Sequence, residues 1–221
     1  MAIQLHHAHA WDLAPKAAIQ VQHQLAGLVR AEPPPHPIKT IGGVDVSIKN
    51  NRARAAIVVI RLDDLSVVEE TALEADIPFP YIPGLLSFRE MPVILPALEQ
   101  LTTWPDAFMT DSQGLAHPRR FGLACHLGVM LNWPAFGVAK TRFIGRSEPL
   151  GEAKGSTIPL IDKKEQIGNV VRTRAGVKPV YVSIGHQFTL EMATELTLRC
   201  SPKYKIPEPT RLAHNLSTKW K

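Results

Sequence analysis

Three acidic residues stand at positions where a carboxylate is costly unless it takes part in chemistry. Asp45 lies two residues after a pair of glycines, in the middle of a strand-like run, and Asp111 ends a short apolar run and opens a glycine-containing loop. Glu90 lies early in a predicted helix that follows a proline-rich loop. Because burying an unpaired carboxylate costs several kcal/mol, each of these acids needs a cation or another partner.

Taken singly, each acid also fits a structural role, such as an ion pair for Asp45 or a favourable helix dipole for Glu90. Taken together, they predict a site for a hard cation, because carboxylate oxygens suit Mg²⁺ and Mn²⁺. A cation also makes the joint ionisation of three carboxylates tolerable. Lys140, at the end of a neighbouring predicted strand, is either a positive charge that faces a phosphate or an exposed strand-end lysine.

Positive charge is concentrated at the carboxyl end of the chain. The 221 residues carry 25 Lys and Arg against 20 Asp and Glu, a formal net charge of +5. Residues 1–198 are balanced, so the excess lies in a basic C-terminal segment, residues 199–221. A neutral body with a basic end indicates a polyanionic partner. Combined with a metal site, it predicts a metal-dependent enzyme that acts on nucleic acid.

The surrounding pattern predicts an α/β fold in one domain of residues 1–221. The amino-terminal part, residues 1–37, is a helix over 12–30 followed by a proline-rich connector. Three closely spaced strands then form an antiparallel meander, at 39–49, 55–62 and 65–72. Further helices alternate with strands, the helices at 86–101 (kinked at Pro96), 119–130 and 189–200, and the strands at 106–110, 134–140, 156–174 (a hairpin) and 178–185. This order implies a mixed sheet with helices packed on it.

Several classes of protein are disfavoured by what the sequence lacks. Cys125 and Cys200 do not form a CxxC pair, which argues against a zinc ribbon or a disulfide framework. There is no apolar run of about 18 residues, so we expect no membrane span. The first residues have no charged segment followed by a long apolar stretch, so they are not a secretory signal. Free thiols suit a reducing compartment, and we expect a cytoplasmic protein.

Six segments of the sequence resemble the endonuclease V family, the deoxyinosine 3′ endonucleases of DNA repair. They are GGVDVSI (42–48), PYIPGLLSFRE (80–90), DSQGLAHPRRFGLACHLG (111–128), GVAKTRFIG (137–145), KPVYVSIGH (178–186) and KIPEPTRLAH (205–214). They occur in the family's order and span almost the whole chain. The resemblance implies a ribonuclease H-like fold: a three-strand antiparallel meander plus parallel strands, flanked by helices. It also implies that Asp45, Glu90 and Asp111 bind Mg²⁺, for which Mn²⁺ can substitute, and that Lys140 and His214 assist near the scissile phosphate.

The resemblance further implies how the substrate is recognised. It implies an enzyme that cuts DNA at the second phosphodiester bond 3′ to an inosine, with Tyr81 as a wedge that fills the gap left by the extracted base. We expect a monomer. The residues implied for the base pocket are Gly84, Leu86, Ser112 and Gly114. Ser112 stands where the family commonly has glycine, and its side chain adds bulk and restricts φ. His117 is expected to order its loop, and Arg211 to lie near the substrate.

Two alternatives stay open on the sequence alone. The first is an inosine-specific endoribonuclease, since the choice between DNA and RNA depends on the 2′-hydroxyl near the cut site. The second is a non-catalytic nucleic-acid-binding module on the same fold. The three acids argue against this module, because carboxylates repel phosphate when no metal is present.

Overall fold

The sheet at the centre of the molecule confirms the predicted fold class. The structure is a computed structural model, and it describes residues 3–220. Its eight strands are ordered β3-β2-β1-β4-β5-β8-β7-β6. β1 pairs with β2, and β2 with β3, as an antiparallel meander, whereas β1, β4 and β5 are parallel neighbours. This is the arrangement of a ribonuclease H-like sheet. The strands are β1 (Thr40–Lys49), β2 (Arg52–Arg61), β3 (Val67–Asp76), β4 (Ala107–Thr110), β5 (Ala135–Ala139), β6 (Thr157–Asp162), β7 (Glu165–Val171) and β8 (Val180–His186).

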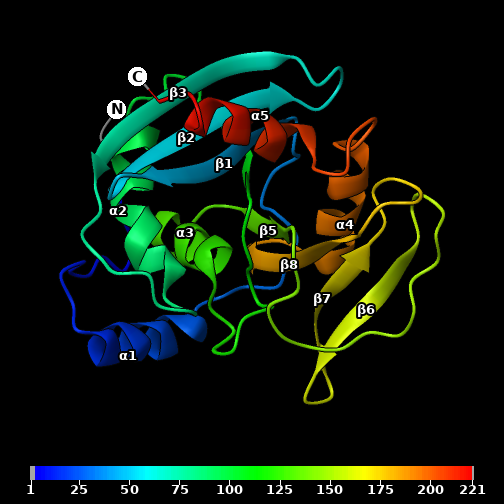
Figure 1. Ribbon diagram of the computed structural model, residues 1–221, viewed down its shortest axis with the longest axis horizontal. Coiled ribbons are helices and arrows are strands. Elements are labelled where there is room, and N and C mark those ends of the chain that lie inside the picture. The colour runs from blue at the N-terminus through cyan, green and yellow to red at the C-terminus, as the bar shows by residue number, and fades with distance from the viewer. Residues whose placement is uncertain (1–2, 221) are drawn as a thin grey trace.

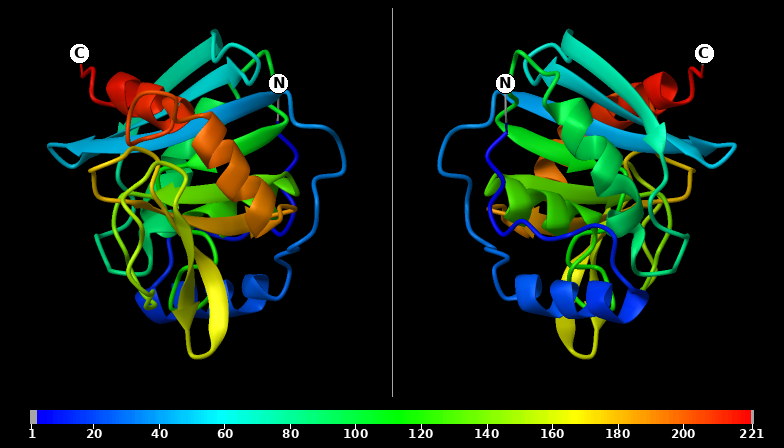
Figure 2. Two further views of the ribbon diagram at one scale, coloured as in Figure 1. Left: turned by 90° about the vertical axis from the view of Figure 1, so that its right-hand side faces the viewer. Right: turned by 90° about the vertical axis from the view of Figure 1, so that its left-hand side faces the viewer.

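Helices cover both faces of this sheet. Those within residues 3–220 are α1 (Pro15–Ala26), α2 (Leu86–Leu98), α3 (Leu123–Leu131), α4 (Leu190–Arg199) and α5 (Glu208–Ser217). α2 and α3 lie on one face, and α4 and α5 on the other (Figure 2). α1 lies next to α3 at the lower left of Figure 1, and the β6–β7 hairpin lies at the lower right, at the edge of the sheet away from β3. Buried apolar side chains fill both interfaces, among them Val44 beneath α2 and Phe136 beneath α4.

The alternation predicted for β1 sets the position of the first acidic residue. Val44 and Val46 belong to the core beneath α2, whereas Asp45 contacts α5 on the other face. Gly43 allows α5 to approach this closely, because a Cβ atom there would lie 2.1 Å from the backbone of Pro209. A glycine is therefore needed two positions before the acid, where helix and strand backbones meet.

The boundaries of two predicted helices differ from the structure. The helix expected from residue 119 begins only at Leu123, because Gly122 is its N-cap and Arg120 has a left-handed backbone with φ 53°. Arg120 instead forms ion pairs of 2.8 Å with both Asp162 and Glu165 of the β6–β7 hairpin. The helix expected over 12–30 is shorter, since α1 spans Pro15–Ala26, while α2 continues through its two internal prolines.

The largest difference from the sequence-based expectation is α5, a helix within residues 199–221, where the sequence predicts only a basic C-terminal segment. Pro207 is its N-cap, Pro209 fits the first turn because it needs no amide donor there, and Glu208 complements the helix dipole. Leu212 and Leu216 repeat at helical spacing and pack against β2. These local signals were present in the sequence, but the charge of the segment obscured them.

Two of the negative expectations concern thiols and membranes. Both cysteines are free and buried, in agreement with the prediction. Burial raises the pKa of each thiol to about 12, so neither is a reactive thiolate near neutral pH. Within residues 3–220, none of the helices combines the length and the apolar character that crossing a membrane requires.

Candidate active site

The three predicted acids line one small cavity of about 40 Å³. Asp45 comes from the middle of β1, and Asp111 follows the last residue of its parallel neighbour β4. The amide of Asp111 donates a hydrogen bond of 3.1 Å to the carbonyl of Val44, which places the two acids next to each other. Glu90 enters from the first turns of α2. Three separate elements therefore bring carboxylates to one point at the carboxyl end of β4, among the inner strands of the sheet.

Neighbouring side chains hold two of these carboxylates. Asp45 Oδ2 accepts a hydrogen bond of 2.6 Å from Ser217 Oγ and lies 3.2 Å from His214 Nδ1, both on α5. Asp111 forms an ion pair with Lys140, which follows β5. The structure thus brings together all five residues for which the resemblance implies a catalytic role. Ser217 is an additional partner that the sequence analysis did not identify, because α5 itself was missed.

The electrostatics of this cluster favour an added cation. Burial, together with the nearby carboxylates of Asp45 and Asp111, raises the pKa of Glu90 to about 8. Burial also raises the pKa of Asp111, although Lys140 opposes this shift. The protein itself therefore neutralises only part of the negative charge that three ionised carboxylates would carry.

Among residues 3–220, no three His, Cys, Asp or Glu side chains are already arranged to hold a metal ion. The reason lies in the partners just described, since Asp111 is turned to Lys140 and Asp45 to α5. The donors nevertheless fit a hard cation. They are carboxylate oxygens from three elements around one cavity, the ligand chemistry that Mg²⁺ prefers.

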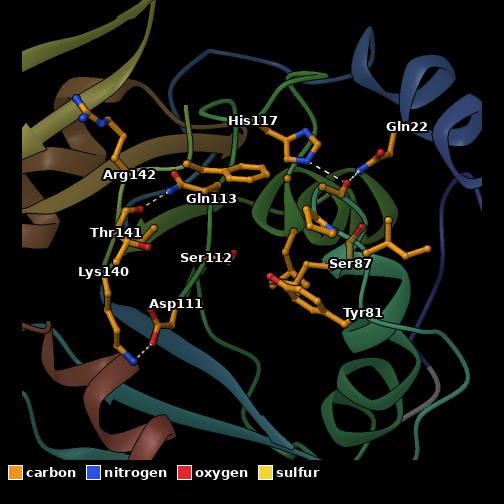
Figure 3. Close-up of a pocket in the computed structure, with 18 residues that line it drawn as sticks. Gln22, Tyr81, Ser87, Asp111, Ser112, Gln113, His117, Lys140, Thr141 and Arg142 are labelled. Atoms are coloured by element: carbon orange, nitrogen blue, oxygen red, sulfur yellow. Dashed lines mark hydrogen bonds and ion pairs between the residues drawn. The ribbon is translucent and has the colours of Figure 1, made fainter. Parts of the chain in front are cut away.

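A larger pocket of about 390 Å³ adjoins the acidic cavity. Tyr81 and Ser87 lie across this pocket from Asp111 and Lys140 (Figure 3). Of the residues implied for base recognition, Gly84, Leu86 and Ser112 line it, and Tyr81 is 69% exposed at its rim. Gln113, Arg142 and Phe143 also line it, although the resemblance assigned them no role.

Gly84 is held by a group of side chains that come from distant parts of the chain. Its φ of 83° is in the left-handed region, which favours glycine. Its carbonyl accepts hydrogen bonds from Gln22 (3.0 Å), His117 (3.0 Å) and Arg119 (2.7 Å). Burial lowers the pKa of His117 to about 4, so the ring is neutral and donates through Nε2. The expected loop-ordering role of His117 is therefore confirmed, whereas no sequence signal indicated Gln22.

Two pocket expectations need correction. Gly114 does not line the pocket: its amide donates to Ser183 Oγ at 2.8 Å, and a Cβ atom would lie 2.0 Å from the carbonyl of Ile184. It is a packing glycine against β8. Ser112 does line the pocket, but its backbone is outside the left-handed region, so serine introduces no φ strain there. Its hydroxyl is hydrogen-bonded to Thr110 Oγ1 at 2.7 Å.

An acidic cavity at the inner strands of a ribonuclease H-like sheet, next to a lysine and an open pocket, defines the class of phosphodiester-cleaving nucleases with this fold. A sequence model of the Endonuclease V family matches residues 23–215. The chain is 48% identical to the endonuclease V of Trichormus variabilis over 219 residues, which cover 98% of this chain and 99% of that protein. The chain therefore belongs to the endonuclease V family.

Solved structures agree with this assignment. The endonuclease V of Streptomyces avermitilis is 42% identical and superposes with a TM-score of 0.89, covering 94% of this chain and 93% of that one. The endonuclease V of Ciona intestinalis is 28% identical, with a TM-score of 0.82 over 92% of this chain and 95% of that one. The Ciona protein was solved in complex with a 24mer DNA that contains an inosine followed by a ribo-adenosine.

Proposed function

We propose that this chain is a DNA repair endonuclease that cuts inosine-containing DNA at the second phosphodiester bond 3′ to the inosine, with Mg²⁺ as cofactor and Mn²⁺ as a substitute. The observation that carries this proposal is the position of Asp111, which lines both the acidic cavity and the larger pocket. A nucleotide held in the pocket therefore has its backbone near the carboxylates. The inosine-containing DNA bound by the Ciona relative supports this choice of substrate.

Each residue of the cluster has a distinct task in this proposal. Asp45, Glu90 and Asp111 hold the ion, which when bound supplies Lewis-acid stabilisation of charge on the phosphate and a more acidic water. Lys140 neutralises Asp111, and its partly exposed ammonium group would face a phosphate oxygen of the bound nucleic acid. His214, half of whose side chain is exposed, orients Asp45 and faces the substrate.

We expect Tyr81→Ala to weaken the binding of inosine-containing DNA by about 1–3 kcal/mol, the range for loss of one stacked base. Tyr81 is exposed at the pocket rim and makes no hydrogen bond within residues 3–220, so its removal should leave the fold intact. Fluorescence anisotropy with a labelled oligonucleotide measures the change. Tyr81→Phe is the matched control, since it keeps the ring. If the alanine variant binds as tightly as the wild type, Tyr81 is not the wedge.

A second candidate is an inosine-specific endoribonuclease. The observation that favours it is the ribo-adenosine placed after the inosine in the DNA that the Ciona relative binds. A ribonucleotide at that position brings a 2′-hydroxyl next to the base that is recognised, and this group is what distinguishes RNA from DNA.

One assay tests both candidates. Matched DNA and RNA strands with a single inosine are incubated with the protein in Mg²⁺ or in EDTA, and the cut is mapped on a sequencing gel. We expect a single cut in DNA, at the second phosphodiester bond 3′ to the inosine, only when Mg²⁺ is present. Faster cutting of the RNA strand would favour the endoribonuclease. Binding that ignores Mg²⁺, with no cleavage of either strand, would indicate a binding module.

A further inference from the structure

Two lysines beside Lys140 have no role in the proposed reaction. Lys178 stands two residues before β8, which is antiparallel to β5 with Ala139 opposite Tyr181. The start of β8 therefore lies next to the end of β5, where Lys140 is found. Lys205, in the segment between α4 and α5, also lies at the end of β5, because its Nζ donates a hydrogen bond of 3.5 Å to the carbonyl of Lys140.

The position of Lys205 is set by its backbone as well as by its side chain. Its carbonyl accepts a hydrogen bond of 2.5 Å from Thr173 Oγ1, and the residue is half-buried. Thr173 follows β7, the neighbour of β8, and is itself buried. Lys205 is thus anchored at both ends, unlike a surface lysine whose ammonium group samples many positions in water.

These charges are not compensated by the protein. Within residues 3–220, no acidic side chain forms an ion pair with Lys178 or Lys205. Burial, together with repulsion from Lys178 and Lys140, lowers the pKa of Lys205, and only Asp111 opposes this shift. An anion that binds between like charges held close together relieves their mutual repulsion, so such a site favours anion binding.

We propose that Lys178 and Lys205, with Lys140, form a phosphate subsite that holds the nucleic-acid backbone beside the bond that is cut. This proposal rests on the proposed function. The neighbouring strand ends on this side of the sheet then have two different roles. The β1 and β4 end carries the carboxylates, and the β5 and β8 end carries the lysines. A lysine ammonium group is a point charge that suits a non-bridging phosphate oxygen without reading the base.

The test is the salt dependence of binding rather than activity. Fluorescence anisotropy measures the affinity for an inosine-containing duplex over a series of salt concentrations, in EDTA so that nothing is cut. Each phosphate contact contributes about −0.9 to the slope of log K against log salt for duplex DNA. We therefore expect Lys205→Gln and Lys178→Gln each to make the slope shallower by about 0.9, with Lys205→Arg restoring it.

Lys39→Gln is the matched control. Lys39 is an exposed lysine immediately before β1, at the opposite end of the parallel strands from Asp111. The salt slope of the Lys39→Gln variant should equal that of the wild type. Slopes of both test variants equal to the wild-type slope would overturn the subsite while leaving the proposed function intact. A wild-type chain that binds no oligonucleotide at any salt concentration would overturn both.

Discussion

Asp111→Asn should lower the rate of cleavage of inosine-containing DNA by at least about a thousandfold, because a catalytic metal supplies several kcal/mol of transition-state stabilisation. Asparagine keeps the size of the side chain but removes the charge that a cation requires. Among residues 3–220, Asp111 is also the acidic residue that lines both the acidic cavity and the pocket. Single-turnover cleavage in excess Mg²⁺ measures the loss.

The fold should survive this substitution. The partner left behind, Lys140, is 39% exposed, so water can solvate its charge. Asp63→Asn is the control, since the Asp63 side chain is 92% exposed in the turn after β2. This variant should cleave at the wild-type rate. Cleavage by Asp111→Asn within tenfold of the wild type, with an unchanged melting temperature, would contradict the assignment of Asp111 as a metal ligand.

Glu90→Gln should stabilise the metal-free protein, and the gain should increase with pH. The pKa of Glu90 is raised from 4.5 to about 8, mainly by burial, so the folded state prefers the protonated acid. A carboxyl group whose pKa is raised in the folded state contributes its full stabilisation when the pH is below its pKa in the unfolded chain. This contribution is lost as the pH rises through its pKa in the folded state. Because Glu90 is only half-buried, we expect a gain of about 1–3 kcal/mol near pH 8.

Thermal unfolding in EDTA between about pH 6.5 and about pH 8.5 tests this result. The lower pH limit avoids protonation of His117. Because the pKa of His117 is lowered in the folded state, the fold becomes less stable as the pH falls below the ordinary histidine pKa of 6.5. Mg²⁺ should raise the melting temperature of the wild type more than that of Glu90→Gln, because the ion removes the cost of the ionised acid. A wild-type protein that is equally stable across this range, or a glutamine variant that gains nothing, would contradict the raised pKa.

Much of the fold could be predicted from short-range patterns. The alternation in β1 and the β-branched run of β2 identified the meander, and Thr189 marked the start of α4, where its side chain accepts a hydrogen bond from the amide of Met192. Such signals act within a few residues, so they do not need the rest of the chain. α5 had similar signals in its prolines and leucines, and it was missed because net charge was given more weight than periodicity.

The site was predictable as a set of residues but not as an arrangement. Acids at a strand centre, a strand end and an early helical position indicated a cation, and the family resemblance named the same residues. Asp111 pairs with Lys140, which is 29 positions away in the sequence, and Lys205 contacts the Lys140 carbonyl from 65 positions away. The order and register of the strands decided these contacts.

By itself, the sequence determined the strands and all helices except α5, the residue types that can bind a cation and the basic character of the carboxyl end. Only the tertiary structure decided that Gly114 packs against β8 rather than lining the pocket, and that Gln22 anchors Gly84 from 62 positions away. The physical reason is the range of the forces involved. Backbone preferences and hydrophobic periodicity are local, whereas hydrogen bonding and charge pairing depend on which surfaces the packed sheet and helices bring together.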